Sequence, residues 1–410
     1  MPLLASRLPI ATATLAATLA ATGCVELDDT PPALVGDDLP DISPSFLGCN
    51  DGVAQIGELC LAPPTTIRAT NGRLKTVLAV DLDADGNRDL VGVDDTRIYV
   101  VRGVAGGFST WSFYQPPGGP LLHDIAAADL DGDGDLDLVA TDTANDRLIV
   151  RHQTGATNFA PALFFPTADG PTRILAARMN GDNRDDLVVL DDNADTIQVF
   201  LAGMLGAPAS YGVGDTDDIA IGDCDATGSI DVMYFNGSGT ATTLLARRNN
   251  LGVLLPPVGS LFPFGQSATE PLPSAPLAIV GGRMNADVFA DVVVSAEWSR
   301  MATGRSNGNC TFTKLAEVHS YAWAYRLRLG DHDGNGTLDV AAPHRTDPAF
   351  DELSVVFGIG NGNLDPAYGL LQSPTGTVYE DAAFGDFNGD GARDLITASQ
   401  PGFLLHRGTP

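Results

Sequence analysis

The stretch AAADLDGDGDLDLVA, residues 126 to 140, places five aspartates at alternate positions between two apolar runs. Carboxylates at such short range repel one another, so an isolated turn of this kind is unfavourable. Glycines at positions 132 and 134 let the backbone turn sharply between the acidic side chains. Alternating carboxylates on a tight turn surround one point, and calcium takes about six to eight oxygen ligands in this way. The stretch therefore predicts a calcium-binding loop.

The same pattern recurs along the chain, so the acidic stretch belongs to a repeat. Its copies begin at Asp81, Asp129, Arg178, Asp223, Arg283, Asp331 and Asp386, 45 to 60 residues apart. An apolar segment precedes each copy, and β-rich runs separated by Gly or Asn turns follow it. Short strands bounded by turn residues predict antiparallel β structure. Four such strands per repeat is the count of a propeller blade.

The two ends of the repeat region complement each other. After the last acidic loop only DLITAS and GFLLHRG remain as strand candidates, so the last blade lacks its outer strand. The segment PTTIRAT, residues 64 to 70, stands before the first inner strand and can supply it. This pairing would remove two free sheet edges. We expect an all-β, seven-bladed propeller with four-stranded antiparallel blades, closed by an N-terminal strand in the C-terminal blade.

The acidic loops and hairpins of the type VVFGIGNGNL (residues 355–364) resemble the FG-GAP/VCBS repeats of the integrin-α-like β-propeller family. The resemblance covers about residues 63–410. It implies a calcium-binding propeller whose loops on one face meet a ligand.

The loops follow D-x-D-x-D-G-x-x-D, and their oxygen-bearing residues are the predicted metal ligands. These are Asp81, Asp83, Asp85 and Asp89; Asp129, Asp131, Asp133 and Asp137; Asp223, Asp225, Thr227 and Asp231; Asp331, Asp333, Asn335 and Asp339; and Asp386, Asn388, Asp390 and Asp394. They predict four to five calcium ions. An EF-hand is excluded because the loops lie between β segments and lack its twelfth-position Glu. Plain acidic turns remain an alternative.

Loops three and five carry Arg178 and Arg283 at the first ligand position. Arginine cannot ligate a cation. We hypothesise that each guanidinium replaces calcium, pairing in loop three with Asp182 and Asp186, and in loop five with Asp287 and Asp291. The alternative is that these loops are decayed and that each Arg is solvated.

The N-terminal region predicts export. Residues 1–23 are typical of a bacterial lipoprotein signal peptide, with Cys24 as the lipidated residue, and 24–48 form an acidic, Pro-rich tether. An ordinary signal peptide, with Cys24 incidental, is the alternative. In the segment 49–62, Cys49 and Cys60 predict a disulfide. Whether Cys224 and Cys310 pair is open. The propeller, 63–410, is thus expected on a lipid anchor at the outer membrane or cell surface of a bacterium.

Charge and motifs narrow the function. The net charge of −29 excludes nucleic acid as a partner. The six histidines are scattered without a catalytic motif, and His332 is expected to face solvent. A non-enzymatic, monomeric binding or adhesion module for an unknown protein or glycan is the leading interpretation. A lectin-like propeller, or a polysaccharide lyase or hydrolase, is the alternative. Tyr321, Trp323 and Tyr325 are either a sugar-stacking patch or core.

Overall fold

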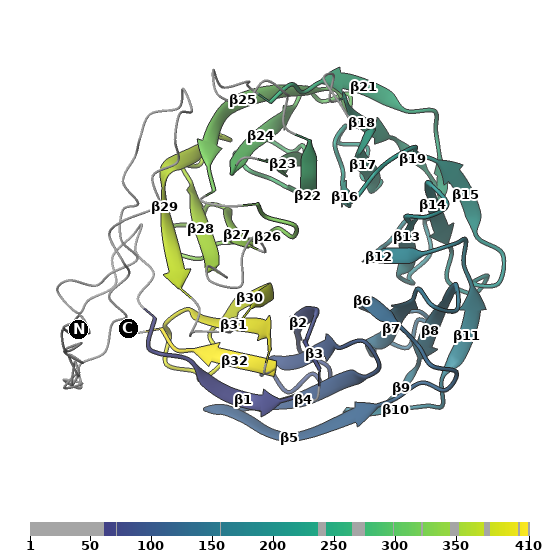
Figure 1. The fold of residues 1–410 in the computed structure, drawn as a ribbon. Helices are drawn as coiled ribbons and strands as arrows, with labels where there is room; N and C mark the ends of the chain where they lie inside the picture. The colour runs from purple at the N-terminus through teal and green to yellow at the C-terminus, as the bar shows by residue number, and fades with distance from the viewer. Residues whose placement is uncertain are drawn as a thin grey trace, which may run out of the picture.

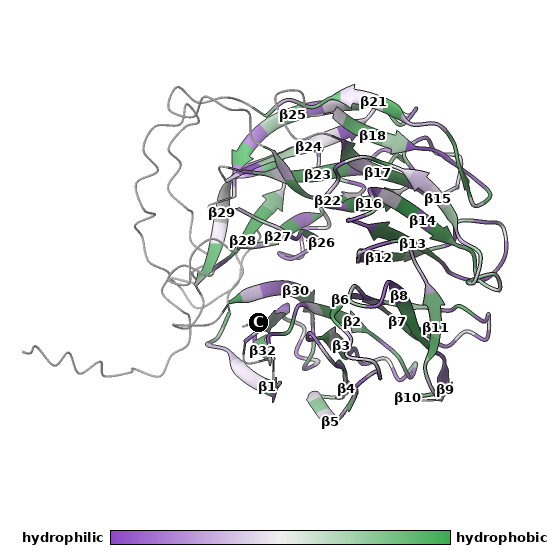
Figure 2. Cartoon of the chain, turned by 45° about the vertical axis from the view of Figure 1, so that its right-hand side comes forward, coloured by the Kyte–Doolittle hydropathy of each residue, from purple (hydrophilic) through white to green (hydrophobic). Residues whose placement is uncertain are grey.

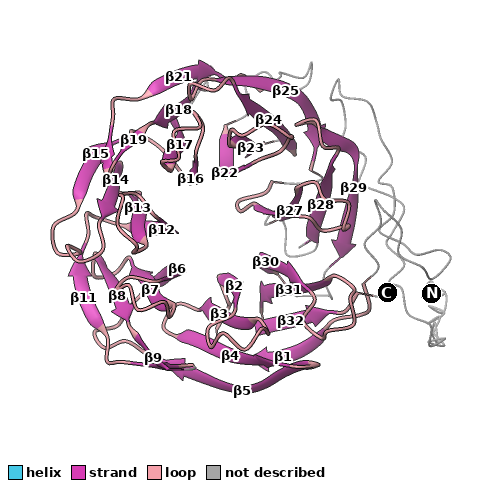
Figure 3. Cartoon of the chain, turned by 180° about the vertical axis from the view of Figure 1, so that it is seen from behind, coloured by secondary structure: helices cyan, strands magenta, loops and turns pink. Residues whose placement is uncertain are grey.

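The computed structural model describes residues 61–70, 72–155, 157–236, 243–264, 275–297, 299–320, 323–344, 352–372, 378–400 and 402–408. The predicted signal peptide, Cys24, the tether and the Cys49–Cys60 disulfide lie outside these residues. Within them all regular structure is β-strand, as Figure 3 shows. Across the same ranges no helix is long and apolar enough to cross a membrane.

Seven four-stranded antiparallel sheets stand around a central axis as the blades of a propeller (Figure 1). Blade one contains β2 (Thr76–Val80), β3 (Asp89–Val93), β4 (Ile98–Val104) and β5 (Gly107–Tyr114). Blade two contains β6 (Leu122–Ala128), β7 (Asp137–Asp142), β8 (Arg147–Arg151) and β11 (Leu163–Pro166). Blade three contains β12 (Pro171–Ala177), β13 (Asp186–Asp191), β14 (Thr196–Phe200) and β15 (Ala209–Gly212).

The remaining blades follow the same plan. Blade four contains β16 (Ile219–Gly222), β17 (Asp231–Asn236), β18 (Thr243–Arg247) and β21 (Val258–Leu261). Blade five contains β22 (Pro276–Gly282), β23 (Asp291–Ala296), β24 (Arg300–Ser306) and β25 (Phe312–His319). Blade six contains β26 (Arg328–Gly330), β27 (Asp339–Pro343), β28 (Glu352–Gly358) and β29 (Leu364–Gln372). Two small hairpins join β9 (Gln153–Gly155) to β10 (Asn158–Phe159) and β19 (Asn249–Asn250) to β20 (Val253–Leu254).

The last blade is built from both ends of the propeller. It contains β30 (Tyr379–Gly385), β31 (Asp394–Ser399), β32 (Gly402–His406) and, as its outer strand, β1 (Thr65–Ala69). Thr65 pairs with Leu405 and Ala69 with Gly402 in an antiparallel register. The predicted seven-bladed propeller and its closure by the N-terminal strand are confirmed.

The core lies between the blades. All residues of β7, β13, β23 and β31 are buried, because a neighbouring blade covers each face of these strands. Hydrophobic colour dominates such middle strands in Figure 2, for example β13 and β23. Seven apolar clusters of the described residues each draw side chains from two adjacent blades. The continuous apolar runs therefore stabilise the ring, not only the single sheets.

Candidate functional site

Each acidic loop joins the innermost strand of a blade to the second strand, and its ninth residue is an aspartate that clamps the loop. In loop one Asp89 Oδ2 accepts a hydrogen bond from Leu82 N at 2.8 Å, and its Oδ1 accepts one from Gly103 N at 2.7 Å. The same two bonds form at Asp137, Asp186, Asp231, Asp291, Asp339 and Asp394. The ninth aspartate thus ties the loop to the end of the third strand, even in the two loops that begin with Arg.

Burial shifts the ionisation of these seven carboxyl groups. Desolvation raises the pKa of Asp231, Asp291 and Asp339 to about 6, and nearby loop carboxylates add to the effect. The pKa of the other ninth aspartates is raised by burial as well. Two backbone N–H donors oppose the shift in each case. The buried carboxylates would therefore be more stable beside a cation.

The first aspartate of a loop shapes the turn. Asp81 Oδ1 accepts a hydrogen bond from Asp85 N at 3.2 Å, and its Oδ2 accepts one from Gly86 N at 2.9 Å. Gly86 has a φ of 87°, which glycine adopts without strain. Equivalent glycine N–H groups donate to Asp129, Asp223, Asp331 and Asp386. The backbone therefore holds the loops in shape.

The donor set of loop one fits a hard cation. Asp81, Asp83 and Asp85 offer carboxylate oxygens within 4.8 Å of one another. The Asp83 side chain is 4% exposed, and neither of its oxygens has a hydrogen-bond partner among the described residues. Arg102 Nη2 lies 2.6 Å from Asp83 Oδ2, which is an ion-pair distance without hydrogen-bond geometry. Because buried polar groups without hydrogen bonds are costly and calcium is coordinated by such oxygens, this arrangement suits calcium.

The other predicted loops share parts of this arrangement. Carboxylates converge within 4.8 Å in loop two (Asp129, Asp131, Asp133) and loop four (Asp223, Asp225, Asp231). In loop four Thr227 is exposed, and its backbone N–H, not its side chain, bonds the neighbouring aspartates. In loop six Asp331 Oδ1 is buried, and no described residue bonds to it. Loop seven holds Asp386 through Gly389 N and Gly391 N. Calcium in these loops stays a prediction.

Arg178 and Arg283 do not occupy the loops as hypothesised. Arg178 is 61% exposed, and its Nε lies 3.4 Å from Asp185 Oδ1, not beside Asp182 or Asp186. Arg283 is also exposed, and in the described part of the chain no ion pair joins it to Asp287 or Asp291. Asp186 and Asp291 instead accept the two backbone bonds of the clamp. The long Arg side chains point to solvent because the clamp already satisfies these carboxylates.

The expectation for His332 is wrong. His332 is 2% exposed, and its ring stacks on Phe384 with centroids 3.6 Å apart. The second loop position faces the core in every blade, where Leu82, Leu130, Met179, Cys224, Met284 and Phe387 are also buried. Burial lowers the pKa of His332 to about 3, so the ring is neutral at physiological pH.

Each of three loops is fastened to the next blade at its second residue. Gln153 Nε2 donates to Leu82 O at 2.6 Å, and Asn249 Nδ2 donates to Met179 O at 2.6 Å. Ser306 Oγ donates to Cys224 O at 2.7 Å. A Cys224–Cys310 disulfide adds a covalent link between blades four and five, which answers the question that the sequence left open.

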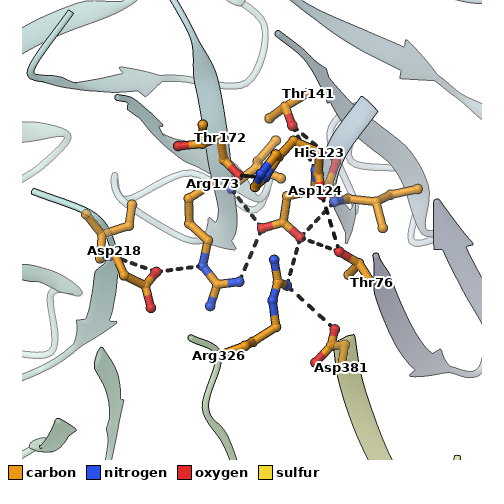
Figure 4. Close-up of polar contacts among 12 residues, drawn as sticks. Thr76, His123, Asp124, Thr141, Thr172, Arg173, Asp218, Arg326 and Asp381 are labelled. Atoms are coloured by element: carbon orange, nitrogen blue, oxygen red, sulfur yellow. Dashed lines mark hydrogen bonds and ion pairs between the residues drawn. The ribbon is translucent and has the colours of Figure 1, made fainter. Parts of the chain in front are cut away.

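A buried ion-pair network crosses the central channel, the space enclosed by the inner strands, near the start of these strands (Figure 4). The acidic loops follow the other ends of the same strands. Asp124 accepts hydrogen bonds from Thr76 Oγ1 at 3.2 Å, Arg326 Nη1 at 3.1 Å and Arg173 Nη1 at 3.3 Å. Arg326 Nη1 also lies 3.5 Å from Asp381 Oδ2. Burial alone would raise the pKa of Asp124, but the guanidinium groups hold it well below its usual value. The network therefore joins distant blades through ionised groups.

Three aspartates at the start of inner strands, Asp124, Asp218 and Asp381, also bond the backbone of the following blade. Asp124 Oδ2 accepts from Ile174 N at 3.2 Å, and Asp218 Oδ2 accepts from Ile279 N at 3.1 Å. Arg173 Nε lies 2.9 Å from Asp218 Oδ1 and so extends the network to blade four. Sequence reasoning missed these residues because they are single charged positions, each 45 or more residues from the next, without a local motif. A charged residue recurring near the start of an apolar inner strand was the available signal.

The aromatic stretch of blade six is neither a strand nor wholly core. Ala324 makes one isolated bridge with His344, and no strand covers residues 323–327. Tyr325 is 44% exposed, Trp323 is partly buried and Tyr321 lies outside the described residues.

One histidine–serine pair resembles a catalytic contact. His344 Nε2 lies 2.8 Å from Ser354 Oγ, and the same Oγ donates to Ser320 O at 3.0 Å. Both side chains are 0% exposed. A substrate cannot reach this serine, so the contact is structural.

Comparisons with known proteins agree with the loops and the fold. Residues 81–140 and 129–189 match the model of the FG-GAP-like repeat. No curated protein matches the chain. Crystal structures of BBS1N in complex with ARL6DN, soaked with lead or with mercury, are similar to it. The alignment with each structure has a TM-score of 0.58 and 14% sequence identity, and it covers 87% of the present chain and 98% of the matched chain. This likeness shows the fold alone. The chain is thus a seven-bladed β-propeller protein with FG-GAP-like repeats.

Proposed function

We propose that the protein is a calcium-stabilised, non-enzymatic binding module, held by a lipid anchor at the bacterial cell envelope. The observation that carries the calcium part is Asp83, a buried carboxylate between Asp81 and Asp85 that pairs with Arg102 but has no hydrogen-bond partner among the described residues. Bound calcium would supply positive charge to these oxygens. Asp81 and Asp85 would also ligate the ion. Because Asp89 bonds both the loop and the third strand, an ordered loop would stabilise that strand as well.

The binding part rests on the shape of the molecule. Seven blades stand around one central axis (Figure 1), and loops join their strands. Loops on rigid scaffolds commonly carry recognition. BBS1N, a protein of the same fold, is seen with ARL6DN, so a surface protein is one ligand class to screen. The exposed Tyr325 beside the channel favours a glycan as the second class.

An enzymatic role has less support. The conspicuous carboxylates belong to the clamp and the acidic loops, and the charged groups of the channel pair with one another. A polysaccharide lyase or hydrolase would need an acid and a base that are free of these pairs and face one another across an accessible pocket.

The proposed location rests on the N-terminal sequence and on the buried disulfide. Cys24 follows a signal-like segment, and a Cys224–Cys310 disulfide suits an exported protein. Metabolic labelling with palmitate tests the anchor. The full chain should carry label, and Cys24→Ser should lose it. Equal labelling of both would contradict the lipid anchor.

Calcium counting tests the metal sites. Equilibrium dialysis of the purified protein against calcium should give about four to five ions per chain. Asp83→Asn should remove one. Asp135→Asn is the matched control, because Asp135 is an exposed residue of loop two outside the predicted ligands, and its count should equal that of the wild type. No bound ion at millimolar calcium would contradict the proposal.

A further inference from the structure

A cavity opens at the channel end opposite the acidic loops. Its volume is about 240 Å³, and its lining includes Arg73, Lys75, His123, Arg326 and Glu380. Pockets for drug-sized ligands span roughly 300–1,000 Å³, so this one suits a single ring or a small acid. It lies beside the ion-pair network of Figure 4, where His123 and Arg326 are drawn.

Cationic side chains outnumber carboxylates in the lining of the cavity, whereas the protein as a whole is acidic. The chain has 23 Lys and Arg against 52 Asp and Glu, yet three cationic side chains and one histidine line the cavity against a single carboxylate. Each lining cation also has an ion-pair partner: Arg73 pairs with Glu380, Lys75 with Asp95, and Arg326 with Asp124 and Asp381. An anion would therefore be attracted through the N–H donors that Lys75 and Arg326 keep outside these pairs, while the acidic surface repels it elsewhere. The cavity is therefore a candidate anion site.

Partners hold these cations in place without enclosing them. Lys75 Nζ donates to Leu122 O at 2.7 Å and pairs with Asp95 Oδ1 at 2.6 Å, which leaves one of its three N–H donors. Both ion pairs of Arg326 use the same nitrogen, Nη1. His123 Nδ1 lies 2.7 Å from Thr172 O, so the neutral ring donates from Nδ1. Donors fixed by neighbours lose little entropy when a ligand binds.

Two tyrosines complete the lining. Tyr325 is 44% exposed at the cavity and offers an aromatic face. Tyr379 also lines the cavity, is 1% exposed, and its hydroxyl has no hydrogen-bond partner in the described part of the chain. Because this hydroxyl is enclosed, Tyr379 forms a wall of the cavity and is not one of the proposed ligand contacts.

We propose that this cavity binds a carboxylate carried on a small ring, of the uronic acid class. The carboxylate would meet Lys75 and Arg326, and the apolar face of the ring would stack on Tyr325. The ligand could be a free acid or the terminal unit of an acidic polysaccharide, since both present the same group. This inference rests on the proposed binding function and names its ligand class.

Isothermal titration with glucuronate, glucose and acetate tests the inference on the calcium-loaded protein. Glucuronate should bind, and its affinity should fall as ionic strength rises. Glucose and acetate should bind at least about tenfold more weakly, because each lacks one of the two contacts. Glucuronate that binds no better than glucose would overturn the proposal. If an acidic oligosaccharide binds as well as glucuronate, the ligand is the end of a polysaccharide. If the oligosaccharide binds more weakly than glucuronate, the ligand is the free acid.

Lys75→Met and Tyr325→Ala should each weaken glucuronate about tenfold. Arg248→Met, at an exposed arginine near the acidic loops, should bind like the wild type. The melting temperature of each variant shows whether it folds. If Lys75→Met does not fold, Tyr325→Ala still tests the proposal. Equal affinity of Tyr325→Ala and wild type would overturn the cavity assignment. If calcium binding and capture of another glycan persisted, the proposed function would still stand.

Discussion

Asp381 Oδ2 accepts a hydrogen bond from the backbone N–H of Val77 at 3.0 Å, across the join where the last blade meets the first. Asp381 is 0% exposed and also accepts hydrogen bonds from Arg328, through Nε at 2.7 Å and through Nη2. The outer strand β1 closes the same blade from the other side. The ring is therefore closed twice, by a strand at its rim and by a carboxylate at its channel.

Asp381→Ala should destabilise the ring closure. It leaves Arg328 and Val77 N–H without their acceptor, and losing one partner of a buried ion pair costs about 3–5 kcal/mol. Urea unfolding should show this loss. Asp135→Asn, at an exposed acidic position, should unfold like the wild type. Equal midpoints for Asp381→Ala and wild type would contradict the closing role.

Gly103→Ala should destabilise blade one. A Cβ at position 103 would lie 2.2 Å from Arg88 O, at the point where Gly103 N meets the Asp89 clamp. Such overpacking costs about 1–3 kcal/mol. Ala202 holds the same position in blade three and bonds Asp186, so Ala202→Gly is the matched control with a loss of at most about 1 kcal/mol. Thermal melts measure both, and a neutral Gly103→Ala would contradict the close approach.

Asp191→Asn should stabilise the protein at pH 8. Asp191 is 0% exposed, and in the described part of the chain no well-formed hydrogen bond reaches either of its oxygens. Burial, with repulsion from Asp146, raises its pKa to about 7, and the nearby Thr167 hydroxyl only partly opposes this shift. In blade two Asp142 has Arg147 as its register partner and ion-pair partner, whereas Asp191 faces Thr196. A raised carboxyl pKa lowers stability progressively as pH rises from about 4 to 7.

The gain from Asp191→Asn should therefore be near zero at pH 4 and reach the order of 2–4 kcal/mol above pH 7. Chemical unfolding at both pH values measures it. Asp142→Asn, which weakens a satisfied carboxylate, should destabilise at pH 8. If Asp191→Asn destabilises at pH 8 as Asp142→Asn does, Asp191 has a charged partner and the argument is wrong.

Removing the Cys224–Cys310 disulfide should lower stability. The two residues are 86 positions apart, and closing a loop of this length contributes about 4–5 kcal/mol in the chain-entropy model. The double variant Cys224→Ala/Cys310→Ala and the reduced wild type should melt at similarly lowered temperatures. A melt insensitive to reductant, with two titratable buried thiols, would mean that the disulfide does not form.

Much of the fold followed from local patterns. The acidic loops are contiguous motifs, so counting them predicted the number of blades. No strand candidate follows GFLLHRG, and this absence indicated residues 64–70 as the outer strand of the last blade. The channel network could not be predicted in this way. Asp124 and Arg326 are 202 residues apart and meet only because the ring brings blades two and six together.

The errors at Arg178 and His332 have one physical origin. Both were assigned from the loop alone, whereas the third strand and the neighbouring blade decide their surroundings. The ninth aspartates are already satisfied by backbone N–H groups, so Arg178 has no free carboxylate there. The packing of adjacent blades encloses the second loop position and with it His332.

The melting temperature of the purified protein in millimolar calcium, and then in excess EDTA, tests the central claim most directly. We expect a large drop in EDTA that calcium restores and magnesium does not, because calcium bound only by the folded loops adds to stability. Equal melting temperatures in calcium and in EDTA would contradict the claim, and the acidic loops would then be turns held by their backbone clamps alone.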